Sequence, residues 1–72
     1  MNLLEAKIGK LKIVDIKANP PTVEYWTRLG IKKGIIINKI ADSNCLIRVL
    51  SSVYALGDSG CKGIEVEEVG NL

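Results

Sequence analysis

The spacing of apolar side chains predicts a chain built mostly of short β-strands. In several segments apolar and polar residues alternate, which is the pattern of a strand that buries only one of its faces. Glycines, a Pro-Pro pair and an Asp-Ser-Asn cluster separate these segments, and such residues mark turns. We predict strands over residues 10–18, 35–41, 45–50, 53–55 and 64–69.

Two of these strands depart from strict alternation. Val14 and Asp15 interrupt the first strand, and we expect a β-bulge there, because one extra residue shifts the side-chain phase by one. Glu68 and Val69 interrupt the last strand, which we expect to fray at that point.

A single short helix is predicted over residues 23–29. Val23, Trp26 and Leu29 recur at a spacing that brings them close to one helix face, and Trp26 is the expected large member of the core. Thr22 is the predicted N-cap, and Gly30 can take the left-handed conformation that ends a helix. Residues 56–63, which hold three glycines, are expected to form an irregular or one-turn helical link.

These elements predict a mainly β fold, with about five strands and one short helix in a single domain over residues 1–72. So many short strands in so short a chain favour a small, closed or nearly closed barrel. Closure removes the unpaired strand edges that an open sheet exposes.

The composition and the first residues of the chain indicate in which compartment to expect the protein. Apolar residues make up 47% of the chain, which argues against disorder, yet its apolar runs are short, as at Ile35–Ile37. A membrane-spanning helix needs about 20 apolar residues. The first residues lack the basic and apolar regions of a secretion signal, so we expect a cytoplasmic protein.

The potentially reactive side chains are few. The chain has no histidine, and Cys45 and Cys61 lie far apart in the sequence rather than in a C-x-x-C pair. We expect two buried or half-buried thiols, because a disulfide is disfavoured in a reducing compartment. Without histidine, no activated nucleophile is evident, so we expect neither an enzyme nor a cofactor.

Charge is unevenly distributed along the chain. Residues 1–40 carry eight basic and three acidic side chains, whereas residues 41–72 carry two basic and five acidic ones. A basic half can face an anionic surface or an acidic partner, but it is also typical of the solvated side of strands.

The order of these features resembles the ferrous-iron-transport protein A (FeoA) family. The most recognisable segment is Arg28–Gly34, in which Leu-Gly is followed by an aliphatic residue and a second glycine. The remaining positions of the resemblance are Leu4, Gly9, Ile13, Ile16, Ile37, Ile47, Val49, Tyr54, Ala55, Leu56, Ile64 and Val66.

This resemblance implies an SH3-like barrel and a bacterial protein associated with transition metals. It implies a cytoplasmic accessory protein that binds the membrane GTPase carrying ferrous iron, ferrous-iron-transport protein B, and modulates iron uptake. Contact with the membrane would be through that partner only. A similar module occurs as the C-terminal domain of metal-dependent repressors of the diphtheria-toxin-repressor type.

The predicted partner surface combines the helix with the loop that follows it. Tyrosine and arginine are enriched at binding hot spots, and lysines would add charge. The candidate contact residues are Tyr25, Arg28, Ile31, Lys32 and Lys33. An alternative for Tyr25 is a partly buried position over the end of the barrel.

The sequence also allows other functions. Glu65 and Glu67 share a strand face, but we expect no tight ferrous-iron site in the monomer. The alternative functions are a nucleic-acid-binding small barrel and a stand-alone regulatory module related to the metal-dependent repressors. Nucleic acid is not expected, because no run of exposed aromatic residues offers a stacking platform.

Overall fold

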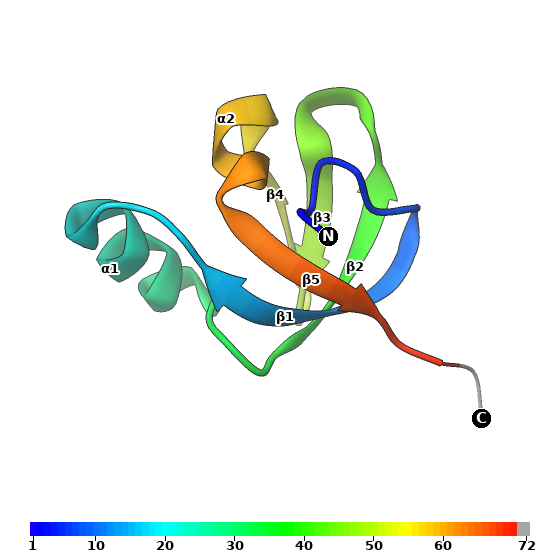
Figure 1. Cartoon of the computed structure of the whole chain (residues 1–72), viewed down its shortest axis with the longest axis horizontal. Helices are drawn as coiled ribbons and strands as arrows, with labels where there is room; N and C mark the ends of the chain where they lie inside the picture. Colours follow the sequence, from blue (N-terminus) through cyan, green and yellow to red (C-terminus); the bar gives the residue numbers. More distant parts are fainter. Residues whose placement is uncertain (71–72) are drawn as a thin grey trace.

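Five antiparallel strands form one sheet in the order β4-β3-β2-β1-β5 (Figure 1). The computed structural model describes residues 1–70, so the last two residues of the predicted domain lie outside the described residues. The strands are β1 Gly9–Ile16, β2 Ile36–Ala41, β3 Leu46–Val49, β4 Ser52–Ala55 and β5 Ile64–Glu68. The predicted mainly β class with about five strands is confirmed, and the predicted short helix is present.

The N-terminal residues cover the free edge of β5. Asn2 forms an isolated antiparallel bridge with Glu65. The Leu3 N–H donates to the Ile64 carbonyl at 2.7 Å, and the Val66 N–H donates to the Met1 carbonyl at 2.8 Å. This edge of the sheet is therefore paired, and the sheet is barrel-like.

The bulge predicted in β1 is confirmed. The register between β1 and β5 shifts between Ile13 and Asp15. Ile13 is buried and Ile16 packs against the core, whereas Val14 between them is exposed. The extra residue thus lets β1 keep apolar side chains in the core on both sides of the bulge.

The helix α1, Pro20–Leu29, begins three residues before its predicted start, so the prediction of Thr22 as N-cap is wrong. Asn19 is the N-cap, and its side chain accepts a hydrogen bond from the Thr22 N–H at 3.1 Å. The two prolines occupy the first helical positions, where no N–H donor is needed. At the other end Gly30 has φ of 92°, as its predicted role in ending the helix requires.

The core lies between the concave face of the sheet, the N-terminal turn and the helices. Trp26, the predicted large core residue, is only 6% exposed. The other fully or nearly fully buried apolar residues are Leu3, Ala6, Leu11, Ile13, Ile31, Ile37, Cys45, Ile47, Val49, Cys61, Ile64 and Val66. Within residues 1–70, no helix is both long and apolar enough to cross a membrane.

The link between β4 and β5 contains a second, shorter helix. This helix, α2, spans Gly57–Lys62 and packs against a 3-10 turn, η1, at Ser43–Cys45. Figure 1 shows α2 at the opposite end of β5 from the C-terminus.

Candidate partner-binding surface

Four of the five predicted contact residues lie on the outside of α1 and the loop after it. Tyr25 is 60% exposed, so it does not occupy the partly buried position considered as its alternative. Arg28, Lys32 and Lys33 are also exposed. We call Tyr25, Arg28, Lys32 and Lys33 the α1–loop surface.

Ile31 is not part of this surface, and its prediction as a contact residue is wrong. Its side chain is fully buried. The Gly30 N–H donates to the Thr27 carbonyl and the Ile31 N–H donates to the Trp26 carbonyl at 2.9 Å. This is the Schellman ending of a helix, which turns the following apolar residue back toward the helix. Ile31 therefore joins the core with Trp26.

Two cations of this surface, Arg28 and Lys33, each lie beside a carboxylate. The Arg28 guanidinium lies 2.8 Å from the Glu24 carboxylate one turn earlier. Both side chains are largely exposed, at 74% and 67%, so this pair contributes little to stability and leaves Arg28 available for binding.

Lys33 connects the loop to β1. Its ammonium lies 3.3 Å from Oδ1 of Asp15, which also accepts a hydrogen bond from the Ile16 N–H at 2.9 Å. The Lys33 contact, followed by the Ile16 bond, holds the pKa of Asp15 below its usual value.

The backbone holds the same loop in place. The Gly34 N–H donates to the Ile13 carbonyl at 2.7 Å, and the Ile13 N–H donates to the Ile35 carbonyl at 3.0 Å. The loop that carries Lys32 and Lys33 is thus fixed to β1 at several points. A surface on fixed elements loses little conformational freedom when it binds.

A shallow hollow lies where α1 approaches α2. Its volume is about 290 Å³. Residues that line it include Lys17, Asn19, Thr22, Trp26, Ser59 and Gly60. The lining holds one cation, two hydroxyl groups and an amide side chain.

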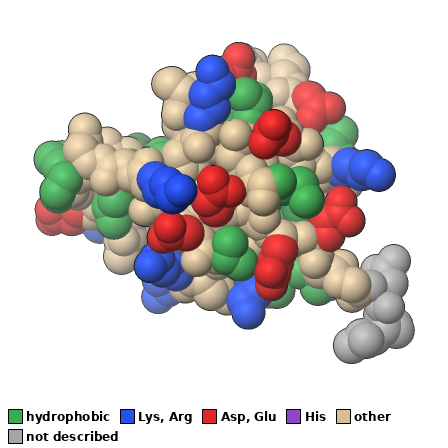
Figure 2. Space-filling view, in the orientation of Figure 1, with side chains coloured by type: hydrophobic (Ala, Val, Ile, Leu, Met, Phe, Trp, Pro, Cys, Tyr) green, Lys and Arg blue, Asp and Glu red, His purple; other side chains and the backbone are tan. Residues whose placement is uncertain are grey.

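The carboxylates of β5 have different neighbours on β1. Glu67 lies opposite Lys12 of β1, and Glu65 lies opposite Asp15. Figure 2 shows acidic and basic side chains mixed over the face that carries β5. The part of the chain that the structure describes contains no group of three or more metal-binding side chains placed to hold an ion.

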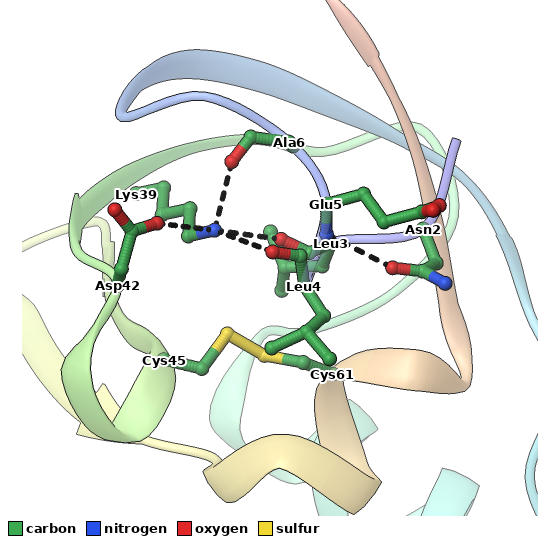
Figure 3. Close-up of polar contacts among 9 residues, drawn as sticks. All are labelled: Asn2, Leu3, Leu4, Glu5, Ala6, Lys39, Asp42, Cys45 and Cys61. Carbon is green, nitrogen blue, oxygen red and sulfur yellow. Dashed lines mark hydrogen bonds and ion pairs between the residues drawn. A yellow bond between two sulfur atoms is a disulfide. The ribbon is translucent and has the colours of Figure 1, made fainter.

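Lys39, one of the eight basic side chains of residues 1–40, is buried, with an exposed fraction of 1%. Its ammonium donates to the carbonyls of Leu3, Leu4 and Ala6 at 2.8–3.1 Å and lies 3.0 Å from Asp42 (Figure 3). The signal for this was available, because Lys39 is in phase with the buried Ile37 on β2.

The expectation of free thiols is also wrong. Cys45 and Cys61 form a disulfide, with Cα atoms 6.7 Å apart, and both residues are fully buried (Figure 3). The predicted burial is therefore confirmed, while the pairing depends on α2 packing against η1. The separation of the two cysteines in the sequence does not indicate whether they form a disulfide.

Comparison with known proteins adds no identification. No protein-family model matches the chain, and neither the curated proteins nor the solved structures contain one that is significantly similar to it.

Proposed function

We propose that this protein is an accessory protein of the FeoA type that binds the cytoplasmic part of the membrane ferrous-iron transporter and modulates iron uptake. The protein would act in the cytoplasm, without catalysis or a cofactor of its own. It would reach the membrane only through its partner. The mainly β, barrel-like fold of five strands agrees with the small barrel that the sequence resemblance implies.

One observation carries this proposal: an exposed aromatic residue stands on a short helix beside three exposed cations. Tyr25 offers a large apolar surface with two side-chain torsions to fix, and such residues are frequent hot spots. Arg28, Lys32 and Lys33 give the site a positive charge, which favours an acidic patch on the partner.

Because the α1–loop surface is held in a fixed conformation, its binding would modulate transport through the conformation of the partner. A fixed surface stabilises whichever conformation of its partner offers the complementary patch. GTP hydrolysis and iron movement would then remain with the transporter. The small protein would shift the balance between the transporter's conformations.

Nucleic-acid binding is the second candidate, and a second group of cations favours it. Lys10 and Lys12 on β1 and Arg48 on β3 are exposed, and Lys10 and Arg48 lie on either side of Asn38 on β2. These cations could contact phosphates, but no tyrosine or tryptophan accompanies them to stack with bases. This group therefore supports non-specific binding at most.

Titration calorimetry with the purified cytoplasmic region of the transporter tests the first proposal. We expect saturable binding that persists at physiological salt and no measurable binding to a single-stranded oligonucleotide. Binding to the oligonucleotide that weakens steeply with added salt, with none to the transporter region, would overturn the proposal in favour of the second candidate.

A further inference from the structure

The helix α2 has little intrinsic stability. It has six residues, and its sequence includes Gly57 and Gly60. Its N-cap, Leu56, makes no side-chain capping bond. Helices this short are marginal in water, and glycine weakens them further. The position of α2 therefore depends on what it is attached to.

The covalent attachment is the disulfide from Cys61 of α2 to Cys45 of η1. On the η1 side, Asn44 and Cys45 have φ of 59° and 49°. Two consecutive left-handed residues without glycine are unfavourable and persist only where surrounding contacts hold them. The Cys45 N–H bond to the Asp42 carbonyl and the disulfide are two such contacts.

The far side of α2 lies against Trp26 of α1. A Cβ atom on Gly60 would stand 3.4 Å from Cζ2 of the Trp26 ring, so the ring faces α2 at Gly60 with room for no more than a methyl group between them. Trp26 and Gly60 also line the hollow between the two helices. Movement of α2 would therefore open this hollow and expose the ring.

We propose that Cys45 and Cys61 are a reversible thiol–disulfide couple that determines whether α2 packs against Trp26. In the disulfide form α2 is held in place. In the dithiol form the link to η1 is lost, the left-handed turn at Asn44 and Cys45 relaxes, and α2 leaves Trp26.

The reductant is a dithiol. One of its thiolates attacks a sulfur of the Cys45–Cys61 bond, which breaks and leaves a mixed disulfide and one cysteine thiolate. The second thiol of the reductant then displaces the other cysteine. Two electrons pass to the protein, both cysteines end as thiols after protonation, and the reductant becomes a cyclic disulfide. Because both sulfurs are buried, the first attack requires α2 to open.

Trp26 is the only tryptophan, so its fluorescence reports on α2 directly. The experiment compares the oxidised protein, the protein reduced with dithiothreitol, the reoxidised protein, and C45S/C61S. Hydrogen exchange is measured for residues 57–62 and, as an internal control, for the β1 and β2 amides. We expect reduction to shift the Trp26 emission to the red and to speed exchange in residues 57–62 by at least tenfold, while the β1 and β2 amides stay protected.

Reoxidation should restore both signals, and C45S/C61S should resemble the reduced protein with or without dithiothreitol. Superimposable emission and exchange in the oxidised and reduced proteins would overturn the proposal. Reduction that occurs only together with exchange of the β1 and β2 amides would also overturn it, since the bond would then open by global unfolding.

A link between the couple and partner binding rests on the proposed function, because Tyr25 is on the same helix as Trp26. Affinity of both forms for the transporter region tests that link. If neither the oxidised nor the reduced protein binds the transporter region, the proposed function fails. The thiol–disulfide couple is still supported if the Trp26 emission and the α2 exchange respond to reduction.

Discussion

The ammonium group of Lys39 is enclosed at one end of the sheet, where it holds the N-terminal turn. The Glu5 and Ala6 N–H groups donate to the Asn2 carbonyl and form a single helical turn. The carbonyls at the end of such a turn have no backbone donor. Lys39 supplies donors to three carbonyls of residues 3–6 and so replaces the missing ones.

Lys39→Met should therefore destabilise the protein. Three buried or part-buried carbonyls would lose their donor, and at ~1 kcal/mol each the free energy of unfolding should fall by about 3 kcal/mol. Asp42→Asn is the control, because the Asp42 side chain is 75% exposed and its ion pair should contribute under about 1 kcal/mol. Chemical denaturation measures both, and equal effects of the two substitutions would contradict this role of Lys39.

The contact between Asp15 and Lys33 makes the stability of the fold depend on pH in the acid range. The pKa of Asp15 is lowered from 3.8, so this carboxylate stabilises the fold above pH 3.8 and loses that contribution as pH falls through its folded-state pKa. Lys33→Met should raise the pKa of Asp15 toward 3.8. A carboxyl titration followed by NMR measures the shift, with Lys32→Met as the control that leaves the pKa unchanged; an unchanged pKa in Lys33→Met would refute the contact.

At the scale of elements, the ends of α1 are set by one side chain and one glycine. Asn19→Ala removes the acceptor of the Thr22 N–H and should lower the free energy of unfolding by about 1 kcal/mol. Thr22→Ala should change it by less than about 0.5 kcal/mol, because the Thr22 hydroxyl is not the cap. Thermal or urea unfolding compares the two. A larger loss from Thr22→Ala would mean that the helix begins where the sequence pattern placed it.

The strands, the bulge and the end of α1 could be predicted from the sequence because each depends on neighbouring residues. Alternation marks the buried face of a strand, and Gly30 is the residue type that a left-handed helix ending favours. The start of α1 was misplaced because Pro-Pro suggested a break. In the structure the same prolines form the first turn of the helix. Proline has no backbone N–H, but the first N–H groups of a helix have no partner within the helix, so no hydrogen bond is lost.

The site was predictable only in part, for the same reason. Tyr25, Arg28, Lys32 and Lys33 are exposed as a helix and loop at the surface require. The inward turn of Ile31 depends on the helix ending. The phase of β2 puts Lys39 on the buried face, but the carbonyls that its ammonium contacts lie more than 30 residues away. The disulfide likewise depends on how distant elements pack. Contacts between distant segments leave no local pattern in a sequence.

At the scale of the whole molecule, the small size of the domain makes the disulfide a large part of its stability. A domain of about 60 residues buries only about 60% of its unfolded surface, and a 72-residue chain is expected to have roughly 4–11 kcal/mol of stability. The bond links residues 16 positions apart, for which loop closure predicts about 3 kcal/mol. C45S/C61S should therefore fold, with a free energy of unfolding lower by about that amount; denaturation that matches the oxidised wild type would contradict this.

The proposed function assigns partner binding to one end of the molecule. In Figure 1, α1 lies at the end of β1 opposite the N-terminal turn. Tyr25 and Lys32 lie at the α1 end, and matched exposed residues lie elsewhere. Val53 on β4 is 48% exposed, and Lys7 before β1 is exposed. The chain thus offers a control of similar type for each substitution.

The most direct measurement is the affinity of the oxidised protein for the cytoplasmic region of the ferrous-iron transporter, compared among these variants by calorimetry. We predict that Tyr25→Ala and Lys32→Glu each weaken binding at least about tenfold, or ~1.4 kcal/mol. Val53→Ala and Lys7→Glu should leave it within about twofold. No binding by the wild-type protein, or equal loss in all four variants, would contradict the proposal that the α1–loop surface binds this partner.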